Sequence, residues 1–99
     1  MNTLDPANIN LSNEIARYIE AQKGATVSAP ELATKFKAHP SRIRGCISLG
    51  RSMGRPICSN AKGYYWSFEP NDLQNTIKHI EDRIKKQQEA VNGLKEWLV

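Results

Sequence analysis

The 99-residue sequence is poor in cysteine and contains no long apolar run. Cys46 and Cys58 are too few for a disulfide scaffold, and their spacing fits no zinc site. We expect two small buried thiols that stay reduced in the cytoplasm. No segment approaches the roughly 18 apolar residues of a membrane span, and no basic-then-apolar leader opens the chain. These absences predict a cytoplasmic protein with no membrane contact and no bound metal.

Residue combinations typical of enzymes are also missing. The sequence shows no Ser/His/Asp or Cys/His set and no glycine-rich phosphate loop. His39 is predicted to lie at the N-terminus of a helix, and His39 and His79 form no ligand pair at helical spacing. We therefore expect neither catalysis nor a cofactor, and no small-molecule ligand is evident.

Acidic residues are absent from the centre of the chain. None occurs among the 37 residues 32–68, whereas four lie in residues 1–31 and six in residues 69–99. The seven basic residues of the acid-free segment are Lys35, Lys37, Arg42, Arg44, Arg51, Arg55 and Lys62. A basic surface confined to one supersecondary unit predicts binding to a polyanion. The alternative is that these charges only keep a surface solvated.

Two helices are predicted ahead of the basic centre. Residues 1–11 mix Asn, Pro and apolar residues without periodicity, so we expect an arm with no regular element. Ser12 is the predicted N-cap of the first helix, which stops before Gly24. Ser28 and Glu31 have the spacing of a capping box at the start of a second helix of about eight residues.

A third helix is predicted to begin with Pro40 at its first position and to end at Gly54. Its buried side is expected to hold Ile43, Cys46, Ile47 and Gly50. The opposite side carries small residues between arginines, which lets a helix approach a groove floor while the arginines reach phosphates or base edges. The candidate DNA contacts on this helix are Ser41, Arg42, Arg44, Gly45, Ser48, Arg51 and Ser52.

Two strands, 55–59 and 63–68, are predicted around a turn at 60–63. The aromatic residues of the second strand alternate sides, so about two of them should cover the helical core. The remaining candidate DNA contacts from charge, on the hairpin and its flanks, are Lys35, Arg55 and Lys62.

A short extended stretch is predicted over residues 25–28, between the first two helices. The resulting order of helix, short strand, helix, turn, helix and hairpin is the plan of a winged helix-turn-helix. Residues 42–57, RIRGCISLGRSMGRPI, and Lys62-Gly63-Tyr64 resemble the N-terminal DNA-binding domain of the bacterial biotin repressor family. In that family an R-x-x-G-x-x-I exit follows the recognition helix, as it does here over 51–57. Gly50 departs from the bulky apolar residue usual in the family, and this departure suggests tight packing against the second helix or Trp66. The resemblance covers about residues 12–68. It implies a third helix in the major groove and a hairpin tip whose Asn60 and Lys62 contact DNA near a phosphate or the minor groove. Only 31 residues follow it, so the ligase domain and its biotin chemistry are not implied.

Beyond Pro70 the apolar residues follow a seven-residue repeat. The predicted seam consists of Leu73, Ile77, Ile80, Ile84, Gln87, Val91, Leu94 and Leu98. This spacing predicts a coiled coil; a helix lying on its own domain is the alternative. A helix of this extent is roughly 40 Å long, so we expect a second chain to cover it. Gln87 resembles the polar seam residues that fix register.

The expected fold is therefore mainly α with a small β-hairpin: an arm over 1–11, a winged helix-turn-helix over 12–69 and an oligomerisation helix over 70–99. The leading functional hypothesis is a homodimer that binds specific sequences of double-stranded DNA and regulates transcription in a bacterium, a phage or another mobile element. Isoleucine at both types of seam position leaves trimers, tetramers and antiparallel pairs open. The alternatives are an architectural component of a replication, packaging or excision complex, and a winged-helix module that binds a host protein.

Overall fold

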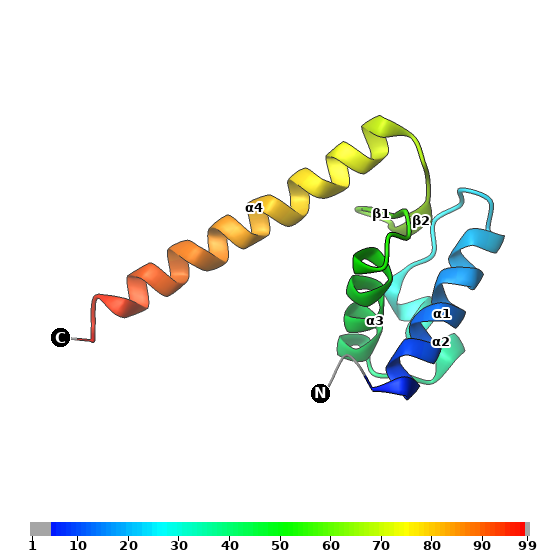
Figure 1. Ribbon diagram of the computed structural model, residues 1–99, viewed down its shortest axis with the longest axis horizontal. Helices are drawn as coiled ribbons and strands as arrows, with labels where there is room; N and C mark the ends of the chain where they lie inside the picture. The colour runs from blue at the N-terminus through cyan, green and yellow to red at the C-terminus, as the bar shows by residue number, and fades with distance from the viewer. Residues whose placement is uncertain (1–4, 99) are drawn as a thin grey trace. The chain divides into compact units, whose positions relative to one another are not determined.

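The computed structural model describes residues 5–98, and the chain divides into two units, Met1–Phe68 and Glu69–Val99. The fold is mainly helical, with one two-stranded antiparallel sheet and a long C-terminal helix, as the sequence predicts (Figure 1). The elements in chain order are α1 (Pro6–Ala21), α2 (Ala29–Phe36), α3 (Pro40–Ser52), β1 (Ile57–Asn60), β2 (Gly63–Trp66) and α4 (Pro70–Lys95).

Helix α1 begins earlier than predicted. Asp5 is its N-cap and accepts a 2.8 Å hydrogen bond from the backbone N–H of Ala7, and Pro6 follows as the first helical residue. The prediction of an irregular arm is therefore wrong for residues 6–11, while residues 1–4 lie outside the described part of the chain. Ser12 is a buried residue inside the helix rather than its N-cap. Polar residues on the buried face, Asn8 and Ser12, conceal the helical periodicity of this segment.

Of the two hydrogen bonds that define the predicted capping box of α2, the structure contains one. The Ser28 hydroxyl accepts from the backbone N–H of Glu31 at 3.2 Å. The Glu31 carboxylate does not return to the cap, because it accepts a 2.9 Å hydrogen bond from the Tyr18 hydroxyl. This bond joins α2 to α1 at the surface of the unit.

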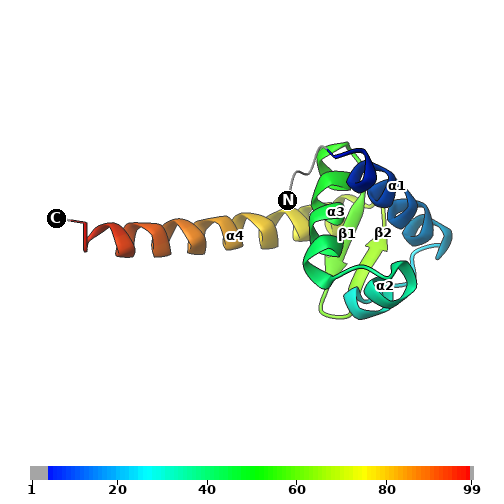
Figure 2. The same ribbon diagram turned by 90° about the horizontal axis from the view of Figure 1, so that it is seen from below.

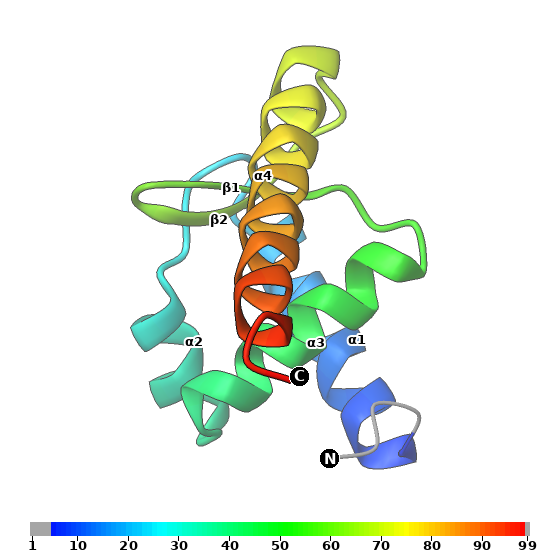
Figure 3. The ribbon, with the colours of Figure 1, turned by 90° about the vertical axis from the view of Figure 1, so that its left-hand side faces the viewer.

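The hydrophobic core lies among the three short helices and the hairpin. Its large aliphatic members are Ile15, Ile19, Val27, Leu32, Ile43, Ile47 and Ile57. Helix α3 contacts both α1 and α2 and also β1, so it is the element that the rest of this unit holds in place. Figures 2 and 3 show the three helices gathered with the hairpin in one unit.

The hairpin is held to the helices by a third short extended segment. Strands β1 and β2 pair Ile57 with Trp66 and Asn60 with Gly63, leaving a two-residue turn. Val27 then bridges Tyr64 on the other side of β2, through two backbone hydrogen bonds of 2.7 and 2.8 Å. At Gly63, φ is +144° and a Cβ atom would collide with the Val27 carbonyl group, so only glycine fits there. As predicted, two aromatic side chains of β2, Tyr64 and Trp66, pack on the core.

Helix α4 contains 26 residues and is therefore about 39 Å long. It ends at Lys95, with Glu96 as its C-cap, so the expectation of a helix over 70–99 is wrong at the C-terminal end. Leu98, the last predicted seam residue, lies beyond the helix because a turn over residues 96–97 follows Lys95. Over the described residues 5–98, no helix has the length and apolar character needed to cross a membrane.

Candidate nucleic-acid interface

The two sides of α3 differ as the sequence predicts. Ile43, Cys46, Ile47 and Gly50 are buried, whereas Ser41, Ser48 and Ser52 are exposed and Gly45 is half-exposed. A shallow hollow of about 190 Å³ lies on the outer side and is lined by Gly45, Ser48, Leu49 and Ser52. A Cβ atom built on Gly45 would have no neighbour within 4 Å. The backbone of α3 is therefore open to close approach along this side.

The start of α3 is stabilised by His39. Its Nδ1 accepts a 3.1 Å hydrogen bond from the backbone N–H of Ser41 and lies 2.8 Å from the Ser41 hydroxyl oxygen. Because Nδ1 accepts, the ring carries its proton on Nε2 in this arrangement. Pro40 occupies the first turn, where its missing N–H leaves no unpaired donor. The prediction that His39 lies at a helix N-terminus is confirmed, and the ring serves as its cap.

Arg44 is the exposed arginine of α3. It has no hydrogen-bond, ion-pair or ring partner among residues 5–98. Lys62 is exposed in the hairpin turn, where the Asn60 side-chain oxygen accepts from its backbone N–H at 2.8 Å. The side-chain cations of Arg44 and Lys62 thus point into solvent, where they can meet an anionic ligand.

Lys35 on α2 is exposed, and its side chain is held by a contact with the ring of Tyr18. Its Nζ lies 4.6 Å from the ring centroid of Tyr18, a distance typical of a cation–π contact. The Tyr18 hydroxyl in turn donates to Glu31, and this hydrogen bond, with burial and the charge of Glu31, raises the pKa of Tyr18. Tyr18 therefore stays a neutral donor, and its ring face remains available to the lysine.

The other three arginines of the acid-free segment make contacts that the sequence does not predict. Arg51 donates from Nε to the Ile57 carbonyl oxygen at 2.7 Å and from Nη2 to the Ser59 hydroxyl at 3.2 Å. Its guanidinium also lies 5.7 Å from the ring centroid of Tyr64. These contacts tie the C-terminal turn of α3 to both strands of the hairpin.

Arg55 and Arg42 bind asparagines of α1. Arg55 donates from Nη1 to the Asn13 side-chain oxygen at 2.6 Å, and Arg42 donates from Nε to the Asn8 side-chain oxygen at 2.9 Å. Both arginines are half-buried, whereas Arg44 is exposed. Three of the predicted DNA contacts therefore also hold α3 in the unit.

Gly50 allows α3 to approach two other elements closely. A Cβ atom at this position would lie 3.2 Å from Cδ1 of Ile57 and 3.4 Å from Oγ of Ser12. The expected tight packing is confirmed, but the partners belong to β1 and α1 and not to α2 or Trp66. Sequence order cannot give these partners because α1 and β1 reach Gly50 only through the tertiary fold.

Both cysteines are buried and unpaired, as predicted. Burial raises the pKa of the Cys46 thiol, an effect that the nearby Arg42 charge partly opposes. The protonated thiol of Cys46 donates to the Asn8 carbonyl oxygen at 3.7 Å. Cys46 therefore contributes to the contact between α1 and α3.

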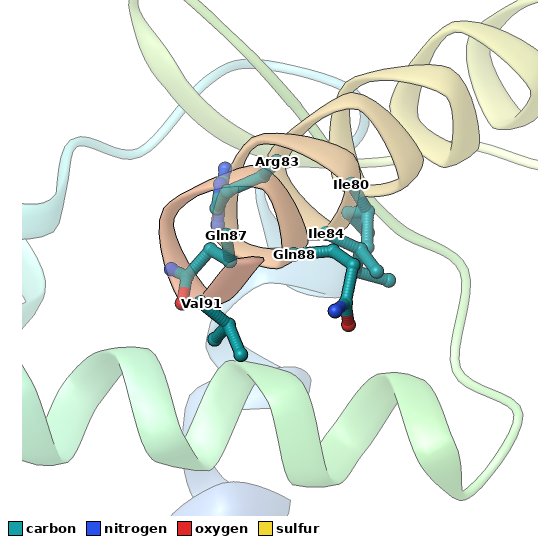
Figure 4. Close-up of a pocket in the computed structure, with 6 residues that line it drawn as sticks. All are labelled: Ile80, Arg83, Ile84, Gln87, Gln88 and Val91. Atoms are coloured by element: carbon teal, nitrogen blue, oxygen red, sulfur yellow. The ribbon is translucent and has the colours of Figure 1, made fainter. Parts of the chain in front are cut away.

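Helix α4 presents a second candidate surface. Five apolar residues of the predicted seam have side chains that are between 43% and 83% exposed. Four lie in α4, namely Ile77, Ile84, Val91 and Leu94, and Leu98 lies just beyond its end. Leu73 and Ile80 are half-buried, and Gln87 is exposed. A hollow of about 280 Å³ along this side is lined by Ile80, Arg83, Ile84, Gln87, Gln88 and Val91 (Figure 4). Most apolar residues of the predicted seam are therefore exposed.

The residues that anchor the arginines were missed by sequence reasoning. Asn8 and Asn13 lie in α1, and Asn8 falls in the segment taken for an irregular arm. A usable signal was present, since Asp5-Pro6 has the N-cap and first-turn pattern recognised at Ser28 and Pro40. It would have extended the first helix over Asn8, whereas Asn13 already lies within the predicted helix.

Across residues 5–98, no group of three or more His, Cys, Asp or Glu side chains could hold a metal ion. Comparison of the chain with protein-family models, with curated proteins and with solved structures finds no match.

Proposed function

We propose that this protein binds double-stranded DNA as a homodimer and regulates transcription. Residues 5–68 act as a winged helix-turn-helix, with α3 as the recognition helix in the major groove and the β1–β2 hairpin as the wing. Helix α4 joins two copies through its apolar seam. The observation that carries the proposal is the outer side of α3, where exposed small residues lie beside the unpartnered Arg44 in a segment without acids.

The outer side of α3 suits a groove on steric grounds. A major groove is about 12 Å wide and admits an α-helix, whose backbone comes nearest to the bases where its side chains are small. Gly45 and Ser48 line the hollow on this side, and Ser41 lies one turn earlier. Serine hydroxyls can donate to or accept from base edges and phosphates.

Different cations have different roles in this proposal. Arg44 reads a base edge, because a bidentate arginine–guanine pair contributes about 1–3 kcal/mol of discrimination. Lys62 on the wing and Lys35 on α2 neutralise phosphates and make affinity depend on salt. Arg42, Arg51 and Arg55 chiefly orient α3 and the hairpin, through the contacts with Asn8, Ile57 and Asn13. Their remaining N–H groups can reach the DNA backbone.

The seam of α4 supports association of two copies. Burying a valine, leucine or isoleucine side chain completely contributes about 1.5–3 kcal/mol, and four such residues of α4, Ile77, Ile84, Val91 and Leu94, are substantially exposed. Two winged-helix units joined in this way would bind inverted half-sites, which suits a regulator of a specific operator.

The direct test is selection of bound sequences from random duplex DNA, followed by titration of the selected site at several salt concentrations. We expect a palindromic site and a linear fall of log affinity with log salt concentration. Arg44→Ala should weaken binding to the selected site by roughly 10- to 100-fold and relax the base preference at one position of each half-site.

The matched control is Arg17→Ala, which removes an exposed arginine of α1 outside the acid-free segment. It has the same effect on net charge but should leave the base preference unchanged. If Arg44→Ala and Arg17→Ala change affinity and preference equally, α3 is not the recognition helix. Protein that binds no duplex at low salt would contradict the proposed function altogether.

A further inference from the structure

We propose that α4 pairs with α4 of a second copy in a parallel, in-register, two-stranded coiled coil, and that Gln87 determines this arrangement. The inference rests on the association proposed above and goes beyond it, because it specifies orientation, register and the residue responsible. Two observations carry it, the order of residues along the seam and the position of Gln87 within it, and the polar groups beside the seam fit the same arrangement.

The seam residues fall into two alternating sets. Steps of three and four residues place Ile77, Ile84 and Val91 in one set, the a positions of the heptad repeat. The other set, the d positions, contains Leu73, Ile80, Gln87 and Leu94. β-branched residues at a with leucine at d favour two parallel strands. Ile80 is the one β-branched residue at a d position within α4.

The hollow on α4 has the outline of two adjacent holes of a coiled-coil seam, a shape that parallel and antiparallel pairs share, because each hole consists of residues i, i+3, i+4 and i+7 of one helix. In a parallel in-register pair, each seam side chain inserts among four residues of the facing helix, whose numbers can be counted from its own. For an a position these offsets are −4, −1, 0 and +3, and for a d position they are −3, 0, +1 and +4. For positions 84 and 87 the union of these sets is Ile80, Arg83, Ile84, Gln87, Gln88 and Val91. The same six residues line the hollow of about 280 Å³ (Figure 4).

Gln87 distinguishes the possible orientations. In a parallel in-register pair, d layers face d layers, so the Gln87 side chains of the two copies meet and can hydrogen-bond each other. In an antiparallel pair, d layers face a layers, and Gln87 then meets an apolar residue such as Ile84 or Val91 in every register. A parallel pair shifted by one heptad brings Gln87 against Ile80 or Leu94. All of these alternatives bury two amides without partners, which is costly.

The flanks of the seam fit the same arrangement. Arg83 and Gln88 project on opposite sides of the seam (Figure 4). A parallel pair places Arg83 of one copy opposite Gln88 of the other, five residues later. The Nε2 of Gln88 donates to the Asn92 side-chain oxygen of its own helix at 3.0 Å. Its carbonyl oxygen is therefore available to accept from the arginine.

A parallel arrangement has a consequence for the proposed dimer. Both α4 helices begin at the same end of the coiled coil, so the two winged-helix units are attached at that end. Adjacent half-sites on one duplex are then within reach of both units. An antiparallel arrangement would attach the units at opposite ends of helices that are about 39 Å long.

Disulfide trapping in the full-length chain tests the orientation. The single-cysteine additions Ile77→Cys and Leu94→Cys are each oxidised mildly, then analysed by non-reducing electrophoresis and peptide mass spectrometry. In the proposed pair, two molecules of the same variant form a disulfide, 77 to 77 or 94 to 94. When the two variants are mixed, reduced, allowed to exchange partners and oxidised again, no disulfide joins position 77 to position 94. The full-overlap antiparallel pair gives only the 77–94 disulfide. The unaltered chain, whose cysteines are buried, is the control.

The role of Gln87 is tested separately with Gln87→Leu in the same cysteine backgrounds. We expect a higher melting temperature of the oligomer and the appearance of 77–94 disulfides, because the leucine removes the penalty on other arrangements. An unchanged disulfide pattern would overturn the role of Gln87.

The outcomes separate this inference from the proposed function. A dimer in light scattering that gives only 77–94 disulfides overturns the parallel orientation but leaves DNA binding and association standing. A monomer overturns the inference together with the association. Parallel disulfides in a protein that binds no duplex support the inference and contradict the proposed function.

Discussion

Ser12 in α1 donates a 2.7 Å hydrogen bond from its hydroxyl to the backbone carbonyl oxygen of Cys46 in α3. Both residues are buried, and the oxygen of Ser12 also lies close to the space that a side chain at Gly50 would fill. The helix that we assign to DNA recognition is thus positioned by a polar contact within an apolar core. This contact, together with the arginine–asparagine bonds, fixes α3 against α1.

Ser12→Ala should lower the stability of the folded unit without changing the surface of α3. Removing one buried neutral hydrogen bond costs about 0.5–1.5 kcal/mol. For a domain of this size the melting temperature should fall by about 4–8 °C per kcal/mol, which calorimetry or circular dichroism measures. Ser48→Ala removes a hydroxyl from an exposed site and should change stability by less than about 0.5 kcal/mol. Equal effects would contradict the structural role of the Ser12 contact.

Substitution by alanine should change the stability of the protein in opposite directions at the two glycines inside α3. Gly45→Ala should stabilise the helix by roughly 0.5–1 kcal/mol, because it reduces the entropy lost on folding and its methyl group meets no neighbour. Gly50→Ala should destabilise the protein, because overpacking against Ile57 and Ser12 costs about 1–3 kcal/mol and outweighs the propensity gain. Denaturant titration measures both. A stabilised Gly50→Ala variant would show that α3 can move away from β1 at little cost.

Gly45→Ala offers a second measurement on the same variant. If α3 enters a groove along its small residues, the added methyl group should weaken duplex binding while the protein becomes more stable. Gly93→Ala in α4 is the control, since its Cβ atom also meets no neighbour and it lies outside the proposed interface. A Gly45→Ala variant that binds as tightly as the original chain would place the groove-facing side elsewhere.

Arg51 and Arg44 should separate stability from binding. Arg51→Ala removes hydrogen bonds to Ile57 and Ser59 and should lower the free energy of unfolding by about 1–2 kcal/mol, since the site is half-exposed. Arg44→Ala should leave the free energy of unfolding within about 0.5 kcal/mol of the original value. Paired unfolding and DNA-binding titrations provide the test. A large loss of stability in Arg44→Ala would reveal an undetected structural role for this side chain.

The two cysteines should be unreactive in the folded protein. Cys46 and Cys58 are buried, and burial raises the pKa of the Cys46 thiol, so little thiolate is exposed near neutral pH. An aromatic disulfide reagent should therefore label them only at the rate of unfolding, and both thiols should react at once in denaturant. Rapid labelling of the native chain at either position would contradict the described packing of α3 or β1.

Much of the fold follows from local signals in the sequence. The Ser28 cap, the position of Pro40, the alternating aromatics of β2 and the heptad spacing of α4 each act within a few residues, so they can be recognised without tertiary information. The failure at α1 has a specific cause. Asn8 and Ser12 are polar residues on a buried face. A search for helical periodicity that counts only apolar residues therefore overlooks them.

The sequence predicts which residues are available to the candidate interface. It does not predict which of the arginines bind partners within the fold and which face solvent. The sequence alone determined that seven cations gather in a segment without acids, that one side of α3 is small and polar, and that α4 carries a continuous seam. Only the tertiary structure decided that Arg42, Arg51 and Arg55 bind partners within the fold while Arg44 faces solvent. The physical reason is that a guanidinium at the surface binds whichever oxygen lies within reach, and Asn13, 42 residues from Arg55 in sequence, comes within 2.6 Å of it only when α1 packs beside α3.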